Sequence, residues 1–208
     1  MKKLLIRGAV LVNPAREIQE CGEPLDLLAV DGRIVAQGIG LPDEDAQVIE
    51  ASGLCCAPGL VDMHVHLREP GFEYKETIET GCLAAARGGF TSIAPMPNTR
   101  PATDCPERIA LVRQKAAQAC GVHVWPIGAV TWGQKGQALT DAAALKKAGA
   151  VALSDDGMPV QNANLLRDAL IRCRRQELTI LSHCEDADMV KNYAVNEGRV
   201  SRALGLPG

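Results

Sequence analysis

Short apolar segments alternate with longer segments of helical character between residues 60 and 196, and this alternation constrains the fold more than any other feature. The predicted strands are residues 60–66, 90–95, 122–129, 151–154 and 178–182. The predicted helices are residues 75–87, 104–120, 141–148, 162–176 and 185–196, with Thr103 or Asp104 capping the second. Because a strand followed by a helix is the repeating unit of parallel sheets, the chain is predicted to have an α/β fold.

Two arrangements of parallel βα units are compatible with this pattern, the doubly wound sheet and the (β/α)8 barrel. No G-x-G-x-x-G segment follows the first predicted strand, so a dinucleotide-binding sheet loses its main support. Polar residues instead recur where the strands end, which is where barrel enzymes build their sites. We therefore predict part of a (β/α)8 TIM-like barrel. A complete barrel needs about eight units and about 250 residues, so this chain of 208 residues is expected to be either a piece of a longer protein or a smaller fold.

The first 55 residues follow a different pattern, with short strands separated by turns and no long helical segment. Asn13-Pro14 is expected to end the first strand, and Asp31-Gly32 is a strong signal for a two-residue hairpin turn. We predict a small β-sandwich-type domain at residues 1–55, followed by the barrel segment at residues 56–208. The strands expected in the first domain are residues 4–12, 25–30, 33–37, 48–50 and 54–57.

Composition argues against several classes of function. The net charge is −3 and aromatic residues make up 3% of the chain, so we expect no nucleic-acid partner. No apolar segment approaches the roughly 18 residues that span a bilayer, and no secretory leader is expected, so we predict a cytoplasmic protein without a membrane partner. The eight cysteines form no C-x-x-C pair, and in the cytoplasm they are expected to be buried free thiols.

Two histidines stand two positions apart at the end of the first predicted barrel strand. Alternate side chains of a strand point to the same side, so His64 and His66 are expected to present two imidazoles to one point. Imidazole is a common ligand of zinc, so this pair is a candidate metal clamp. His183 closes the strand at 178–182 and is a third candidate ligand, whereas His123 begins its strand and is expected on the stability face.

Adjacent carboxylates follow the fourth predicted strand, at Asp155 and Asp156. Two neighbouring carboxylates are costly together unless a cation or hydrogen bonds hold them. One of the pair is therefore expected to bind metal and the other to support it, and the residues alone do not decide which is which. The alternative is a solvated loop in which an aspartate caps the next turn.

The loops after the first two barrel strands carry candidate substrate-binding groups. The planar guanidinium of Arg68 suits recognition of a carboxylate. The alternative for this side chain is a surface ion pair with Glu69 or Glu73. Prolines stiffen the loop at residues 95–101, which is expected to present Asn98 near the same site.

Four segments of the chain resemble, in the same order, the motifs of the dihydroorotases, a family of the amidohydrolase superfamily. They are Gly-Leu-Val-Asp-Met-His-Val-His-Leu-Arg-Glu-Pro-Gly at 59–71, Met-Pro-Asn-Thr-Arg-Pro at 96–101, Ser-Asp-Asp-Gly at 154–157 and His-Cys-Glu-Asp at 183–186. The resemblance extends over essentially the whole chain, including the β-rich first part.

This resemblance implies a (β/α)8 barrel with a β-sandwich side domain, and a zinc-dependent cyclic amidohydrolase that binds one or two zinc ions. The implied reaction is the reversible interconversion of (S)-dihydroorotate and N-carbamoyl-L-aspartate in de novo pyrimidine synthesis. The chain is implied to be the N-terminal half of such a protein, and the general base is implied to be an aspartate of a later strand, beyond residue 208. Ligation needs neutral histidines, so activity is expected to fall in acid. The implied metal ligands are His64, His66, Asp156 and His183, with Asp155 beside them, and the implied substrate-binding residues are His66, Arg68 and Asn98.

Related proteins supply the alternatives. Dihydropyrimidinases and hydantoinases usually bridge two metals with a carboxylated lysine, but Lys146 and Lys147 lie on the helix that precedes the fourth predicted strand. Allantoinases resemble the first motif closely, but Arg68 favours a substrate with a carboxylate. A third interpretation is a non-catalytic scaffold for aspartate transcarbamoylase, although such scaffolds usually lose the metal ligands that this chain retains. We expect a small-molecule substrate, a homodimer and an association with aspartate transcarbamoylase.

Overall fold

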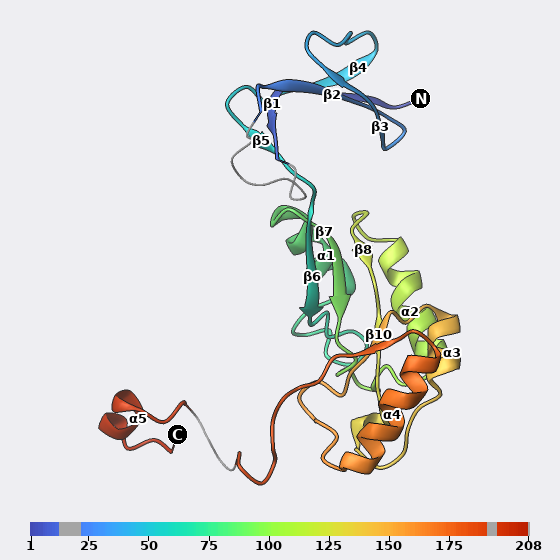
Figure 1. The fold of residues 1–208 in the computed structure, drawn as a ribbon, viewed down its shortest axis with the longest axis vertical. Helices are drawn as coiled ribbons and strands as arrows, with labels where there is room; N and C mark the ends of the chain where they lie inside the picture. Colours follow the sequence, from blue (N-terminus) through green and yellow to red (C-terminus); the bar gives the residue numbers. More distant parts are fainter. Residues whose placement is uncertain (13–21, 191–194, 208) are drawn as a thin grey trace. The chain divides into compact units, whose positions relative to one another are not determined.

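The computed structural model describes residues 1–12, 22–190 and 195–207 and divides into two compact units, Met1–Gly59 and Leu60–Gly208 (Figure 1). The first unit is β-rich and the second alternates strands with helices. An α/β fold is therefore confirmed. The predicted domain boundary after residue 55 and the sandwich architecture of the first unit stay predictions.

The first unit is built around its first strand. That strand, β1, pairs antiparallel with β2 on one side and parallel with β4 on the other, and its end pairs parallel with β5. β3 pairs antiparallel with β2 through the predicted hairpin, in which Asp31 (φ 49°) and Gly32 (φ 80°) both adopt positive φ, as a primed turn requires. The predicted stop at Asn13-Pro14 lies outside the described residues. The strands are β1 (Lys3–Leu11), β2 (Leu25–Val30), β3 (Arg33–Gly38), β4 (Ala46–Glu50) and β5 (Cys55–Cys56).

The second unit contains two three-stranded parallel sheets. One has the order β6-β7-β8 and the other the order β11-β10-β9. The strands are β6 (Leu60–Val65), β7 (Phe90–Pro95), β8 (His123–Val124), β9 (Ile127–Gly128), β10 (Ala152–Leu153) and β11 (Thr179–Ile180). The helices are α1 (Ile78–Arg87), α2 (Pro106–Ala117), α3 (Ala142–Ala148), α4 (Ala163–Arg175) and α5 (Arg199–Leu204), with a short 3₁₀ helix at Trp132–Gln134.

Two predictions about this unit are corrected by the structure. The single strand expected at 122–129 is broken between β8 and β9, which belong to different sheets. Pro126 lies at the break, and proline has no N–H to donate to a strand partner. The helix expected at 185–196 is wrong for its described part, because residues 185–190 form a single turn in which the backbone of Asp188 donates to the Asp186 carboxylate. Residues 191–194 lie outside the described residues.

The start of α2 also differs from the prediction. Cys105, rather than Thr103 or Asp104, occupies the N-cap position and makes no side-chain cap. Pro106 begins the helix, where its missing N–H costs nothing. The carboxylate of Asp104 instead bonds Arg108 and accepts from the backbone of Gly133 at 2.8 Å. Asp104 therefore joins α2 to the loop after β9.

The helices α2, α3 and α4 lie on the same side of the parallel strands (Figure 1). Asp141 and Asn162 cap α3 and α4 with their side chains, as expected for residues that precede an apolar helical segment. Packing beneath α3 is tight, because a Cβ on Gly128 would lie 2.9 Å from Leu153 and 3.0 Å from Leu145. The main core cluster of this region contains Ile109, Val130, Ala142, Leu145, Ala150, Leu153, Ala169, Cys173 and Leu178.

Burial of the cysteines differs from the prediction. No disulfide is found among the described residues, but of the seven described cysteines just Cys82 and Cys173 are buried. Burial raises the pKa of the Cys82 thiol to about 11. Cys21 lies outside the described residues. No helix in the described ranges is long and apolar enough to span a bilayer.

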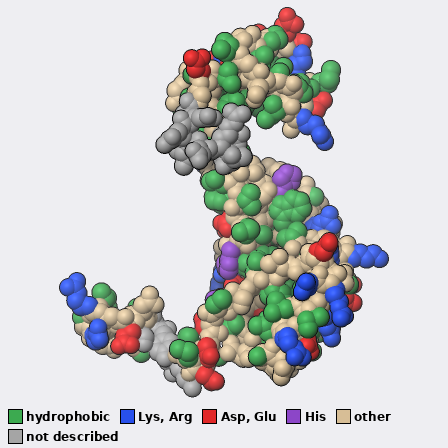
Figure 2. Space-filling model, in the orientation of Figure 1, with side chains coloured by type: hydrophobic (Ala, Val, Ile, Leu, Met, Phe, Trp, Pro, Cys, Tyr) green, Lys and Arg blue, Asp and Glu red, His purple; other side chains and the backbone are tan. Residues whose placement is uncertain are grey.

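The first strand of the second unit is exposed. β6 pairs with β7 alone within the described residues. Hydrophobic side chains lie at the surface of this unit (Figure 2), and on β6 they include Leu60, Val61 and Met63. β6 therefore carries exposed apolar side chains within the second unit.

Replacement of Leu145 by alanine is expected to destabilise the second unit by about 2–5 kcal/mol, because it leaves a cavity in the closely packed core. Leu145 is 0% exposed, whereas Leu170 on α4 is 50% exposed and provides a matched control. Urea unfolding followed by the fluorescence of Trp125 and Trp132 measures both variants. Equal midpoints for the two would contradict the packing described above.

Candidate metal centre

The predicted site residues lie where parallel strands of the second unit end. His64 is on β6, and His66 is the first residue after the strand, which ends at Val65. Asp156 follows β10 and His183 follows β11. Carboxyl ends of parallel strands share one edge of a fold, so residues distant in sequence meet there.

The carboxylate of Asp156 lies between the histidines. One oxygen, Oδ1, is 3.4 Å from Nε2 of His64, and the other, Oδ2, is 3.7 Å from Nε2 of His66. The ligand atoms of His64, His66 and Asp156 all lie within 4.8 Å of one another. The two imidazole rings are 5.3 Å apart in an edge-to-face arrangement. These three residues form the histidine–aspartate group.

His183 approaches the same carboxylate from the end of β11. Its Nδ1 atom is 3.3 Å from Oδ1 of Asp156, and its Nε2 atom is 3.2 Å from Oε2 of Glu185. His183 thus contacts Asp156 without being one of the three residues of the histidine–aspartate group. Glu185 was not singled out from the sequence, and it lies in the segment wrongly predicted to be helical.

Asp155 faces away from the histidine–aspartate group. Its carboxylate accepts from the backbone N–H groups of Val130 at 2.8 Å and Thr131 at 3.1 Å, and from the Thr131 hydroxyl. Burial raises the pKa of this carboxyl group, and the three hydrogen bonds oppose that shift. Of the two adjacent aspartates, Asp156 therefore faces the histidines and Asp155 holds the loop after β9. Thr131 is 24 positions before Asp155 and carries no local signal of this contact.

Asn98 also lies against the histidine–aspartate group. Its Oδ1 atom is 3.0 Å from Nδ1 of His66, and its Nδ2 donates to Oδ2 of Asp156 at 3.0 Å. The loop that carries it is held by backbone bonds, because Thr99 and Thr103 both donate to the carbonyl of Pro97. The amide therefore bridges two side chains that come from different strands.

Arg68 lies on a loop attached to the loop of Asn98. The N–H of Arg100 donates to the carbonyl of Pro70 at 2.9 Å. A Cβ on Gly71 would lie 2.0 Å from the carbonyl oxygen of Arg100, so glycine is required for this approach. No ion pair joins Arg68 to Glu69 or Glu73 among the described contacts, which disfavours the surface-pair interpretation.

Glu69 pairs with groups on two helices rather than with Arg68. Its buried carboxylate accepts from the backbone of Ile78 at the start of α1 and from the ammonium group of Lys115 on α2. The residue that follows Arg68 is thus fastened to two helices. The φ of Arg68 is +59°, an unusual value for a residue with a Cβ. The contacts of Glu69 and Pro70, the two residues that follow, hold the backbone there.

The donor set fits a divalent metal. Imidazole nitrogens with a carboxylate oxygen are the ligands that zinc and similar transition metals take in proteins. The side chain of Asp156 is 7% exposed, and the described contacts of its oxygens are with three imidazoles and the Asn98 amide. A buried carboxylate is costly without a compensating charge, so a cation between these groups would be stabilised.

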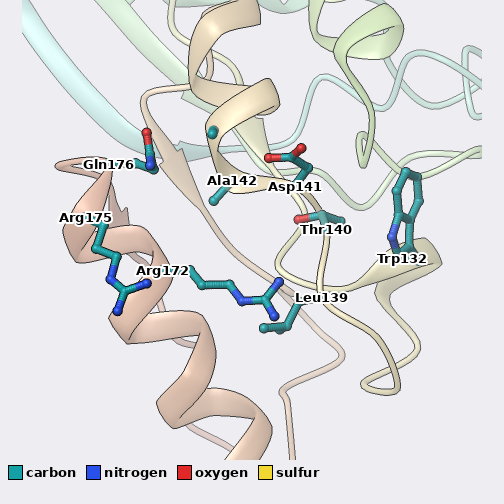
Figure 3. Close-up of a pocket in the computed structure, with 9 residues that line it drawn as sticks. Trp132, Leu139, Thr140, Asp141, Ala142, Arg172, Arg175 and Gln176 are labelled. Atoms are coloured by element: carbon teal, nitrogen blue, oxygen red, sulfur yellow. The ribbon is translucent and has the colours of Figure 1, made fainter.

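His123 and an open hollow beside α3 and α4 lie apart from the histidine–aspartate group. His123 begins β8, as expected, and its ring lies 6.1 Å from that of Trp125. An open hollow of about 420 Å³ lies between the end of the 3₁₀ helix, α3 and α4 (Figure 3). Trp132, Arg172 and Arg175 line it, and none of the histidine–aspartate group does.

Replacement of Thr131 by valine is expected to destabilise the second unit by about 1–3 kcal/mol, because a buried acceptor of Asp155 loses its hydroxyl donor. Thr131 is 0% exposed, so water cannot replace the donor without rearrangement. The matched control is Thr131→Ser, which keeps the hydroxyl and loses a methyl group. Urea unfolding measures both, and a valine variant as stable as the serine variant would contradict the role given to this hydrogen bond.

Comparison with curated proteins finds close relatives. A dihydroorotase of Pelotomaculum thermopropionicum is 49% identical over 211 residues, and the match covers 99% of this chain and 47% of that protein. A dihydroorotase of Ruminiclostridium cellulolyticum is 50% identical over 206 residues, covering 99% of this chain and 47% of that protein. The chain thus spans about half the length of the curated relatives it matches.

Solved structures share the fold at lower identity. The L-hydantoinase (dihydropyrimidinase) of Arthrobacter aurescens matches with a TM-score of 0.74 and 23% identity, over 89% of this chain and 41% of that one. A D-hydantoinase matches with a TM-score of 0.70 over the same shares. The family model described as Dihydro-orotase-like matches residues 53–208, which is most of the chain. With that match and relatives near 50% identity, the chain belongs to the dihydroorotase-like family.

Proposed function

We propose that this chain is the metal-binding part of a zinc-dependent dihydroorotase, which interconverts (S)-dihydroorotate and N-carbamoyl-L-aspartate. The observation that carries the proposal is the meeting of His64, His66 and Asp156 within 4.8 Å, in a chain about half identical to dihydroorotases over nearly its full length. The second unit is, on this proposal, the first part of a (β/α)8 barrel, and the first unit belongs to a β-sandwich side domain.

The proposed metal ligands are arranged around Asp156. His64, His66 and Asp156 would hold zinc through imidazole nitrogens and a carboxylate oxygen, and His183 would be a further ligand on the other side of Asp156. The carboxylate suits a shared role because its Oδ1 faces both His64 and His183 while its Oδ2 faces His66. One ion binds if His183 is a ligand of the same zinc as His64 and His66, and two bind if His183 is a ligand of a second zinc.

The proposed substrate contacts come from the loops after β6 and β7. The guanidinium of Arg68 pairs with the substrate carboxylate in a bidentate manner, which fixes the ring in one orientation. Asn98, which contacts His66 and Asp156, completes the substrate contacts together with the metal ligand His66. The chemistry that zinc supplies when bound is polarisation of the ring carbonyl and activation of a water molecule. The general base is proposed to come from a part of the protein outside this chain.

A hydantoinase-type cyclic amidase is the second candidate, because solved hydantoinases share the fold. The segment after β10 contains Ser154, Asp155 and Asp156 and no lysine, whereas Lys146 and Lys147 lie on α3. The lysine that usually bridges metals in those enzymes therefore has no counterpart there. The expected homodimer, the association with aspartate transcarbamoylase and the cytoplasmic location stay predictions.

Purified chain is expected to retain zinc after dialysis, and His64→Ala is expected to lose it, because a ligand of the clamp is removed. Metal analysis of the dialysed protein measures the zinc content per chain. The matched control is His123→Ala, which removes a histidine outside the histidine–aspartate group and should leave zinc content unchanged. Hydrolysis of dihydroorotate is assayed on the same samples and on the longer protein.

The outcomes separate the candidates. Zinc that disappears in His64→Ala, with dihydroorotate hydrolysis by the longer protein, supports the proposal. Zinc together with hydrolysis of hydantoin and not of dihydroorotate supports the hydantoinase-type amidase. A folded wild-type protein that binds no zinc and turns over neither substrate would leave the scaffold interpretation and exclude the proposed enzyme.

Replacement of Arg68 by methionine is expected to weaken binding of N-carbamoyl-L-aspartate to the zinc-loaded protein by about tenfold or more, since a hydrogen bond to a charged group contributes about 1.5–3 kcal/mol. Arg68→Lys keeps the charge but not the bidentate geometry, so it should recover part of the affinity. Titration calorimetry measures both. Arg87→Met, at the exposed end of α1, is the control, and an equal loss there would argue against a specific role for Arg68.

A further inference from the structure

The amide of Asn98 makes two contacts whose chemistry fixes its orientation. An ionised carboxylate accepts hydrogen bonds and cannot donate them. The amide group that faces Asp156 at 3.0 Å must therefore be the NH₂ group, Nδ2. It follows that the carbonyl oxygen, Oδ1, faces His66, whose Nδ1 atom lies 3.0 Å away.

This orientation determines the protonation of the imidazole. A carbonyl oxygen only accepts, so Nδ1 of His66 must carry the hydrogen in this contact. In a neutral imidazole the other nitrogen, Nε2, then has the free lone pair. Nε2 is the atom that lies 3.7 Å from Oδ2 of Asp156, on the side of the proposed metal. The two ligand atoms are thus prepared for the same cation.

The loop that holds Asn98 is suited to such a role. Pro97 is fully buried, and its carbonyl accepts from the backbone of Thr99 at 2.8 Å and of Thr103 at 3.0 Å. The N–H of Met96 donates to the carbonyl of Val65 at 2.9 Å, which ties this loop to the residue just before His66. The amide is therefore carried on backbone that is fastened directly to the strand of the histidines.

We propose that Asn98 is a positioning residue for the metal site, which holds His66 with its hydrogen on Nδ1 and aims Nε2 of His66 and Oδ2 of Asp156 at one cation. The inference rests on the proposed function and deepens it. It is compatible with a substrate contact, because the NH₂ group has a second hydrogen besides the one given to Asp156. Groups that orient a metal ligand typically change metal affinity by 10–100-fold when removed.

The test combines zinc affinity with a direct reading of the tautomer. Asn98→Leu keeps the approximate size of the side chain and removes both polar contacts. We expect it to bind zinc about 10–100-fold more weakly, as measured by competition with a chelator. Nitrogen-15 NMR of the metal-free protein, with labelled histidine, should show His66 with hydrogen on Nδ1 in the wild type and no longer held to that form in the variant.

Two further variants separate positioning from a general structural effect. Asn98→Asp keeps an oxygen that can accept from His66, so it should preserve the Nδ1–H tautomer that Asn98→Leu loses. Asn164→Leu makes the same replacement at an exposed asparagine on α4 and should change neither zinc affinity nor the tautomer. Circular dichroism verifies that each variant is folded.

Wild-type zinc affinity and tautomer retained in folded Asn98→Leu would overturn the inference, even where substrate binding is weakened. Loss of the Nδ1–H form in both Asn98→Leu and Asn98→Asp would also overturn it, because the acceptor oxygen would then not be what holds the ring. A wild-type protein that binds no zinc would instead refute the proposed function, while the tautomer measurement on metal-free protein would still decide the role of Asn98.

Discussion

The buried carboxylate of Asp156 is the group around which the rest of the site is arranged. Three imidazoles and one amide contact its two oxygens, and they come from the ends of β6, β7 and β11. The site residues on these strands are far apart in the sequence, so the distances between them depend on the register of the strands. The hydroxyl of Ser154 donates to the carbonyl of Leu181 at 2.7 Å and so fixes the end of β10 against the end of β11. A shift of either strand would move the carboxylate away from His183.

Two adjacent aspartates, at the start of the turn that follows β10, contact different parts of the structure. Asp155 takes three donors from the loop after β9, and Asp156 takes the donors of the site. Their charges are thereby held in different surroundings, which reduces the cost of placing carboxylates side by side. The two-residue segment Asp155–Asp156 therefore both stabilises the loop after β9 and orients the candidate metal ligand.

Sequence patterns predicted what depends on local geometry. The period of a strand placed His64 and His66 on one side, and turn chemistry located the hairpin at Asp31 and Gly32. Interactions between distant segments were not predictable in this way, because nothing near Asn98 indicates that its amide bridges His66 and Asp156, 58 positions further along. The error at residues 185–190 has a local cause, since the carboxylate of Asp186 competes for backbone N–H groups that a helix would use.

The loops that carry Arg68 and Asn98 are attached to one another, and on the proposed function this attachment links the substrate-binding groups to the metal site. Arg100 donates its N–H to the carbonyl of Pro70, and the approach of Gly71 to the carbonyl of Arg100 leaves no room for a side chain. On the other side, Glu69 is held by the first turn of α1 and by Lys115 of α2. The proposed substrate-binding guanidinium and amide are thus carried on two loops that contact each other directly. On the proposed function, this contact keeps the two groups in a fixed relation, as the positioning of a reacting substrate requires.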